Sequence, residues 1–280
     1  MLLVDTSGSM LLPIDPSAAS CPAGCGTAAN QCPSSCPTRI SVLRTAVSNW
    51  LAVKGSTLRL GLTTYPSGSL CEPAQAPAVA LPAATTTDVG TSSTLSANAS
   101  QVSIGLQARM PQGGTPTGPS LTVVGALPGL NANDGRADYV VLLTDGLPNC
   151  NSNNANSLCA CGASCTTTQI SSCQCTTSAC TGTLCSLGCL DSAGAITAIS
   201  ALNTSGIKTM VVGFGADVSA GAAPAVLDAM ARAGGAPRSC PNGTVAECGG
   251  STCLSNHTCQ QAFYGAATAS ELQAVLEGLF

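Results

Sequence analysis

Two aspartates and a group of hydroxyl side chains stand where the sequence predicts the ends of strands. Asp5, Ser7 and Ser9 follow the apolar stretch MLLV, and Asp145 follows the apolar stretch YVVLLT. Thr115 lies between them in GGTPTG, whose glycines let the backbone turn tightly before a helix. These side chains offer only oxygen ligands, which suit a hard cation: Mg²⁺, or alternatively Mn²⁺ or Ca²⁺.

The mixture of ligands in this group indicates what the cation would do. Held mainly by neutral hydroxyls, with two carboxylates nearby, a divalent cation stays electron-poor and attracts another anionic oxygen from outside the protein. A storage site would instead surround the ion with carboxylates. The simpler alternative is that Ser7 and Ser9 only cap or turn the chain. That alternative leaves Thr115 and Asp145 as a coincidence.

Apolar periodicity predicts strands and helices that alternate along the chain. The expected strands are 1–5, 58–65, 78–84 (a weak edge strand), 139–144, 208–214 and 262–265, and the expected helices are 38–53, 98–110, 118–127, 191–203, 224–233 and 270–280. This alternation predicts an α/β fold: a Rossmann-like open, mostly parallel sheet with helices on both faces. Ligands of such sheets bind at the carboxyl ends of the strands, where Asp5 and Asp145 are expected.

Eighteen cysteines in 280 residues indicate an oxidising compartment and a set of disulfides. They cluster in three stretches that interrupt the α/β pattern: residues 11–37, 149–190 and 238–261. We interpret these as insertion one, insertion two and insertion three of a single domain that covers residues 1–280. Cys71 stands alone.

The order of strands and insertions predicts how the cysteines pair. Insertions one and two and Cys71 follow strands and belong at the carboxyl edge, whereas insertion three precedes a strand and belongs at the opposite edge. Insertion two holds nine cysteines, so Cys71 is expected to pair with one of them, and insertion three is expected to pair internally. The alternative is zinc bound by four thiolates, drawn from the following cysteines: Cys21, Cys25, Cys32, Cys36 and the CxC pairs 159/161 and 173/175.

The motifs DTSGS, GGTPT and TDG, in this order on an alternating α/β chain, resemble the von Willebrand factor A domain and its metal-ion-dependent adhesion site. The resemblance covers nearly the whole chain and implies that a divalent cation is held by five residues: Asp5, Ser7, Ser9, Thr115 and Asp145. It also implies that hydroxyls touch the metal directly, that the aspartates often act through water, and that an acidic ligand group completes the coordination. The chain departs from the family pattern in its cysteine-rich insertions and in having no residues before the first strand.

The predicted function is metal-dependent binding of a protein or glycan that offers an acidic group, outside the cell or at its surface. The alternative is an intracellular domain of the same fold in a metal-chelatase-like or complex-assembly system, which would not need 18 cysteines. No enzyme is expected, because no set of acid, base and nucleophile accompanies the metal motif. The alanine-rich composition points to a bacterium, and a signal segment is expected to be missing from the sequence.

Composition excludes two other classes of partner. Only 8% of the residues are charged and the net charge is −4, so the chain lacks the basic face that nucleic acid requires. No apolar run is long enough to span a membrane. Two further features have ordinary interpretations: GFG at 213–215 is expected to be a turn at a strand end, and His257 a loop residue.

Overall fold

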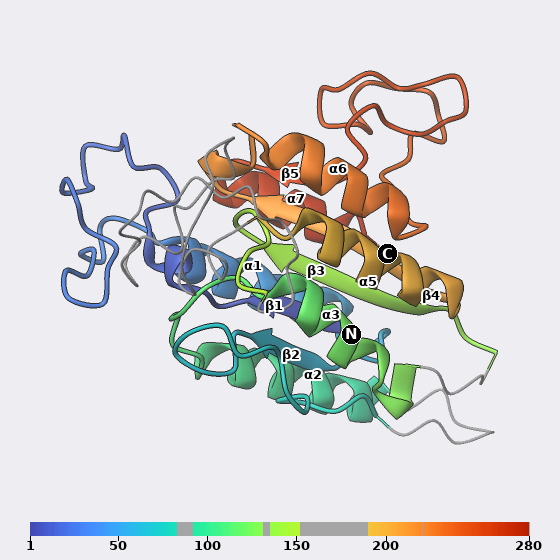
Figure 1. Cartoon of the computed structure of the whole chain (residues 1–280), viewed down its shortest axis with the longest axis horizontal. Coiled ribbons are helices and arrows are strands. Elements are labelled where there is room, and N and C mark those ends of the chain that lie inside the picture. The colour runs from blue at the N-terminus through green and yellow to red at the C-terminus, as the bar shows by residue number, and fades with distance from the viewer. Residues whose placement is uncertain (83–91, 131–134, 152–189, 220, 280) are drawn as a thin grey trace.

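A computed structural model describes residues 1–82, 92–130, 135–151, 190–219 and 221–279 of the chain (Figure 1). Along the chain the elements are β1 (Leu2–Asp5), η1 (Gly8–Leu11), α1 (Arg39–Lys54), β2 (Leu62–Tyr65), α2 (Ser92–Gln107), α3 (Thr117–Gly125), η2 (Pro128–Leu130), β3 (Asp138–Thr144), α5 (Ser192–Thr204), β4 (Ile207–Phe214), η4 (Ala216–Ser219), α6 (Ala223–Ala233), β5 (Tyr264–Ala266) and α7 (Ala269–Glu277). No helix in these described segments is long and apolar enough to span a membrane.

The five strands form one sheet in the order β2-β1-β3-β4-β5, and every neighbouring pair is parallel. The chain therefore moves from β1 to β2 on one side and later returns to β3 on the other side of β1. Successive side chains of a strand point to opposite faces. In β1, Leu2 and Val4 accordingly join one buried cluster, and Leu3 joins the other.

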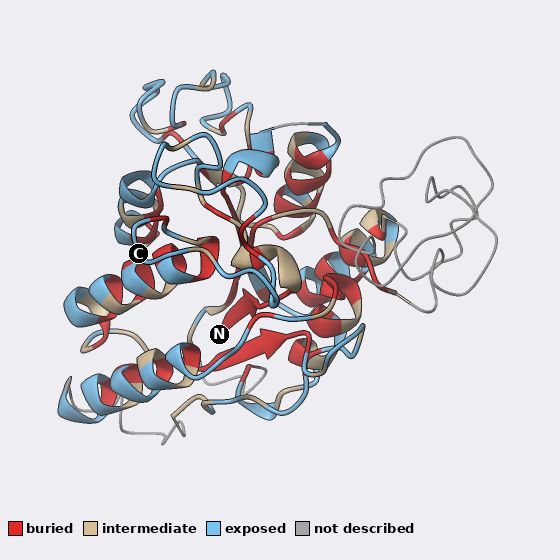
Figure 2. Cartoon of the chain, turned by 90° about the vertical axis from the view of Figure 1, so that its left-hand side faces the viewer, coloured by how far each residue is buried: buried red, intermediate tan, exposed pale blue. Residues whose placement is uncertain are grey.

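Within the described part of the chain, each face of the sheet is covered by three helices. On one face α1 contacts both α2 and α7, and on the other α5 contacts both α3 and α6. The helices turn buried stripes toward the sheet and exposed stripes outward (Figure 2). This is the open parallel α/β arrangement, with helices on both faces, that the sequence predicts, and it agrees with the fold implied by the resemblance to the von Willebrand factor A domain.

Helix ends follow local sequence signals. The hydroxyl of Thr38 accepts a hydrogen bond from the Ser41 amide at the start of α1, and Thr268 caps α7 in the same way through Glu271. Both satisfy an amide that the first helical turn leaves without a partner. The first of these caps fixes where α1 begins, and hence the position of Arg39, its first residue.

Two expected strands are shorter than predicted. The strand expected at 58–65 is paired only from Leu62 onward, because β1 offers partners only from Leu2, opposite Leu62. The edge strand expected at 78–84 is reduced, within its described part, to one antiparallel bridge between Leu62 and Val79. Pro77, just before this stretch, and Pro82 within it have no amide hydrogen to donate to a ladder.

Helix α2 is displaced toward the N-terminus relative to the expected 98–110. It begins at Ser92, because Leu95 extends the buried stripe of Ala99, Val102 and Leu106 by one more turn. It ends at Gln107, ahead of Pro111, which disfavours helix in the residue before it.

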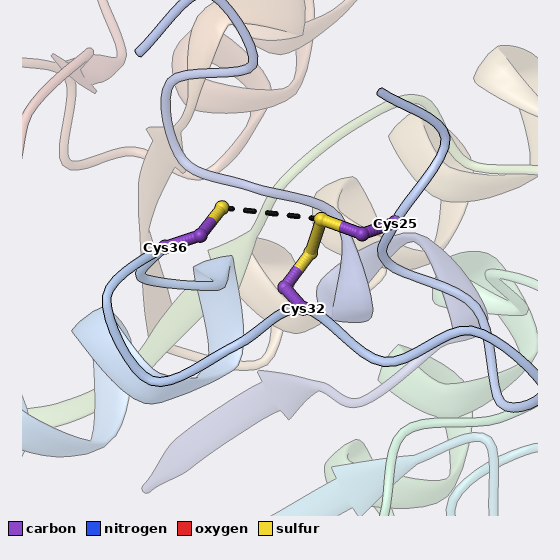
Figure 3. A group of neighbouring side chains, drawn as sticks. All are labelled: Cys25, Cys32 and Cys36. Atoms are coloured by element: carbon purple, nitrogen blue, oxygen red, sulfur yellow. Dashed lines mark hydrogen bonds between the residues drawn. A yellow bond between two sulfur atoms is a disulfide. The ribbon is translucent and has the colours of Figure 1, made fainter. Parts of the chain in front are cut away.

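Five disulfides join ten of the 18 cysteines, and the other eight lie in 152–189, outside the described residues. The pairs are Cys21–Cys36, Cys25–Cys32, Cys71–Cys150, Cys240–Cys253 and Cys248–Cys259. The predicted bond from Cys71 to insertion two and the internal pairing of insertion three are confirmed. The zinc alternative is wrong for insertion one, because all four of its thiols are consumed, although Cys25 and Cys36 of different disulfides approach to 4.0 Å (Figure 3).

Insertions one and three lie at opposite ends of the molecule (Figure 1). Insertion one is anchored where the amide of Arg39 donates to the carbonyl of Leu12. Insertion three begins beside the start of β4, where Thr209 donates to the carbonyl of Gly234. The prediction that these insertions occupy different edges of the sheet is therefore confirmed.

Candidate metal centre at the carboxyl edge

Asp5 and Asp145 are neighbours because of the sheet order. Asp5 is the last residue of β1, and Asp145 directly follows β3, which is paired in parallel with β1. The connection that leaves β1 leads to β2 on one side of this pair of strands, and the connection that leaves β3 leads to β4 on the other side. The carboxyl ends of β1 and β3 therefore form the switch point at which open α/β sheets bind ligands. Both aspartates are almost fully buried.

A chain of hydrogen bonds links these two carboxylates through the two serines. Asp5 Oδ1 accepts from the Ser7 amide at 2.8 Å, the hydroxyls of Ser7 and Ser9 lie 3.0 Å apart, and Ser9 Oγ donates to Asp145 Oδ1 at 2.9 Å. A hydroxyl has one proton. Because Ser9 donates its proton to Asp145, Ser7 must donate to Ser9, and both oxygens keep lone pairs that could bind a cation.

Thr115 lies on a loop that contacts the first motif. The Gly8 amide donates to the carbonyl of Gly113 at 2.9 Å. Thr115 itself is held through its backbone, since its amide donates to Asn149 Oδ1 at 2.8 Å and its carbonyl accepts from the Asn149 amide at 3.0 Å. The structure therefore places the loop of Thr115 against the first motif, at Gly8, and against the segment that follows Asp145, at Asn149.

Sequence reasoning did not single out Asn149, which was only the first residue of insertion two. Its nearly buried side chain clamps Thr115 from the segment that follows Asp145. Its place four residues after Asp145, in TDGLPN, was the available signal.

The environment of Asp5 fits a cation. The pKa of this carboxyl is raised to about 7, first by burial and second by the nearby Asp145, and hydrogen bonds from Ser7 and Thr144 only partly oppose the increase. Ionised Asp5 is therefore a buried anion beside a second anion, which is unfavourable unless a positive charge is close. The donor set of two carboxylates and neighbouring hydroxyls suits a hard divalent cation.

Arg39 is a second residue that sequence reasoning missed. From the first turn of α1 its guanidinium donates to Asp145 Oδ2 at 2.8 Å and to Asp217 Oδ2 at 2.6 Å. The arginine is buried, whereas the side chain of Asp217 is 62% exposed. One oxygen of Asp145 thus faces Arg39 and the other faces Ser9.

The raised pKa of Asp5 predicts an unusual pH dependence for the metal-free protein. The carboxyl ionises at 3.8 when unperturbed and at about 7 in the folded chain. Between these values the folded state keeps a proton that the unfolded chain has lost, so this group makes the free energy of unfolding fall as pH rises. In chelator-treated protein, Asp5→Asn should match the wild type near pH 4 and exceed it in stability at pH 8, as measured by urea unfolding. A constant difference across this range would contradict the raised pKa.

The sequence matches no protein-family model and no curated protein. Among solved structures, a variant of the PilB minor pilin from Streptococcus sanguinis gives a TM-score of 0.50 at 15% identity, over 98% of this chain and 58% of the pilin. The pilus adhesin SpaC from Lactobacillus rhamnosus GG gives 0.48 at 18% identity, over 98% and 29% of the two chains. The conserved hypothetical protein BatB from Bacteroides thetaiotaomicron gives 0.36 at 16% identity, over 76% and 64%.

This chain spans less than two thirds of each of these three proteins. At such identities the likeness concerns the fold alone.

Proposed function

We propose that this chain is an adhesion-type binding module. It holds a divalent cation, Mg²⁺ or alternatively Mn²⁺ or Ca²⁺, and uses it to bind an acidic group of a protein or glycan. The residues proposed to hold the cation are Asp5, Ser7, Ser9, Thr115 and Asp145. The proposed role is binding rather than catalysis.

One observation carries this proposal: Ser7 and Ser9 connect Asp5 and Asp145 at the switch point of the sheet, through the Ser7 amide to Asp5, the contact between the two hydroxyls and the Ser9 hydroxyl to Asp145. Serines that only turned the chain would not need to connect two buried carboxylates from different strands. The arrangement instead brings negatively charged carboxylate oxygens and neutral hydroxyl oxygens together at one place.

The surrounding residues prepare these oxygens. Asp5 is fixed by the Ser7 amide on one oxygen and by the Thr144 hydroxyl, at 2.8 Å, on the other. Arg39 occupies Asp145 Oδ2. A bound dication would supply an electron-poor centre that accepts one more oxygen, and a carboxylate is the ligand such a centre prefers.

Apolar side chains stand close to this edge. Leu70 is 47% exposed, and its carbonyl accepts from the Gly114 amide, next to Thr115. Met110 is 68% exposed, and the Gln112 amide, two residues on, donates to the carbonyl of Thr6. We expect the partner's acidic group to be flanked by apolar side chains, because buried apolar contact supplies the non-directional part of an interface.

The disulfides bear on where the module works. A reducing cytosol would keep these thiols reduced, so five disulfides fit an extracellular or cell-surface location. The intracellular chelatase-like or complex-assembly role gains no support from them.

Metal titration tests the proposal directly. Adding Mg²⁺ or Mn²⁺ to chelator-treated protein should raise Tm, because a ligand of the folded state alone stabilises it by about 2.7 kcal/mol at a hundredfold excess over Kd. Asp5→Ala should remove this increase. Asp15→Ala, which changes an exposed aspartate of insertion one that contacts Ser17, should preserve it. A wild-type Tm that does not respond to these metals would end the metal-dependent proposal.

The acidic ligand is tested with immobilised peptides that differ only in carrying Asp or Asn among apolar residues. The Asp peptides should retain the wild type in the presence of Mg²⁺ and release it when EDTA is added. They should not retain Thr115→Ala, although its circular dichroism spectrum should match that of the wild type. Equal retention of Asp and Asn peptides, or retention that resists EDTA, would contradict recognition through a metal.

A further inference from the structure

Arg39 forms a buried bridge between the metal centre and the turn that follows β4. Its guanidinium joins Asp145, at the end of β3, to Asp217 in η4. Its Nε is buried and has no hydrogen-bond partner among the described residues. Arg39 therefore contacts the two carboxylates through its two terminal nitrogens and not through Nε.

The position of Arg39 in its helix argues for a role in the site. It is the first residue of α1, and the dipole of a helix disfavours a cation at that end. Burying a guanidinium also carries a desolvation penalty. Both effects disfavour a buried arginine at this position of the helix. The two carboxylates that it contacts are therefore what stabilises it there.

The turn after β4 is shaped to receive this side chain. Gly215 has φ +94°, and a Cβ built on it would lie 3.2 Å from Arg39 Nε. The GFG sequence that was interpreted as a strand-end turn therefore also makes room for the guanidinium and places Asp217 against it. A side chain at position 215 would therefore crowd the guanidinium of Arg39.

We propose that Arg39 is the positioning residue that sets the charge of the metal centre, an inference that rests on the proposed function. It holds Asp145 Oδ2 and so leaves Oδ1, on the Ser9 side, to face the cation. Counting Asp5, Asp145 and Arg39, the buried group has a net charge of about −1, which a dication changes to about +1. One carboxylate from a partner then brings the group to neutrality.

This arrangement exchanges metal affinity for ligand affinity. Without Arg39 the two aspartates would neutralise a dication completely, so the metal would bind more tightly and the loaded centre would attract an anion less. With Arg39 the centre binds metal less tightly and keeps a positive charge for the partner. Asp217 reduces this effect of Arg39, because its carboxylate offsets part of the guanidinium charge.

The test compares four variants by calorimetric titration of Mg²⁺ into chelator-treated protein. A charge a few ångströms from a proton site changes proton affinity tenfold or more, so we expect Arg39→Met to bind Mg²⁺ roughly tenfold more tightly than wild type. Arg39→Lys, which keeps the charge, should bind as wild type does. Asp217→Asn should bind more weakly than wild type, and by less than tenfold, because the charge that it removes is exposed and screened. Arg44→Met, on the same helix but hydrogen-bonded to the Leu106 carbonyl, should change nothing.

A purely structural arginine would give a different pattern. It would lower the metal-free Tm of Arg39→Met and weaken its Mg²⁺ binding. We expect instead a lower metal-free Tm together with a larger metal-induced increase. Acetate, followed by water-proton relaxation of the Mn²⁺-loaded protein, should bind Arg39→Met roughly tenfold more weakly than wild type.

The outcomes separate the two proposals. If wild type binds no Mg²⁺ or Mn²⁺, the proposed function fails. If wild type binds metal but Arg39→Met binds it no more tightly than Arg39→Lys, the role of Arg39 inferred here is wrong. If Arg39→Met does not fold, Asp217→Asn provides the test. Binding of Mg²⁺ by Asp217→Asn that is as tight as in wild type, or tighter, would overturn the inference on its own.

Discussion

Removing the Cys71–Cys150 disulfide should produce the largest loss of stability of any single cross-link in the described chain. For its sequence separation of 79 residues, the chain-entropy model assigns about 4.5 kcal/mol to the cross-link. We therefore expect Cys71→Ser/Cys150→Ser to lower the free energy of unfolding by about 4 kcal/mol, measured by urea denaturation.

The same variant should weaken metal binding, because the disulfide adjoins the loop of Thr115. Cys150 follows Asn149, whose side chain and amide hold Thr115. A Cβ at Gly114 would meet Cys150 Sγ at 2.4 Å, so the disulfide packs directly on this loop. Losing it frees both the segment after Asp145 and the loop around Leu70, and calorimetry should report weaker Mg²⁺ binding than in wild type.

Insertion three supplies the matched control. Cys248→Ser/Cys259→Ser removes a cross-link with a separation of 11 residues at the opposite edge, for which the same model assigns about 2.8 kcal/mol. It should leave Mg²⁺ affinity unchanged. If both double variants lose equal stability and neither changes metal binding, the Cys71–Cys150 bond has no special connection with the site.

The sheet, and the neighbouring positions of Asp5 and Asp145 at its edge, could be predicted from the sequence because they depend on short-range signals. Strands such as 139–144 are apolar throughout since both faces of the sheet are covered. Parallel strands bring their carboxyl ends to one edge, so residues that directly follow such strands, such as Asp5 and Asp145, meet without any knowledge of side-chain contacts. The disulfide from Cys71 followed from the same reasoning about edges.

The residues that support the site could not be predicted in this way, because their partners are distant in sequence and lie on helices or turns. Arg39 is 106 residues from Asp145 and 178 from Asp217. No periodicity marks such a pair; the position of a cation at a helix start was the one indication. Likewise, the length of β2 depends on how many residues of β1 lie opposite, which is a property of the pairing rather than of residues 58–65.

A second large effect can separate the ion pair that Asp145 forms with Arg39 from its proposed role as a metal ligand. Asp145→Ala leaves the buried Arg39 with only the exposed Asp217. Breaking a buried pair by removing one partner costs about 3–5 kcal/mol. We expect a loss near the lower limit, because Asp217 remains, together with loss of the metal-induced increase in Tm.

Adding Arg39→Met to Asp145→Ala should restore at least about 1 kcal/mol of that loss, because no buried charge is then left without its partner, and replacing both members of such a pair is often nearly neutral. The double variant should still show no metal-induced change in Tm, since one of the two proposed carboxylate ligands is gone. Thermal unfolding with and without Mg²⁺ measures both quantities. If stability is restored and Mg²⁺ does not change Tm, the contribution of the ion pair is separated from that of metal binding. If the Tm of the double variant again rises with Mg²⁺, Asp145 is not needed to hold the cation.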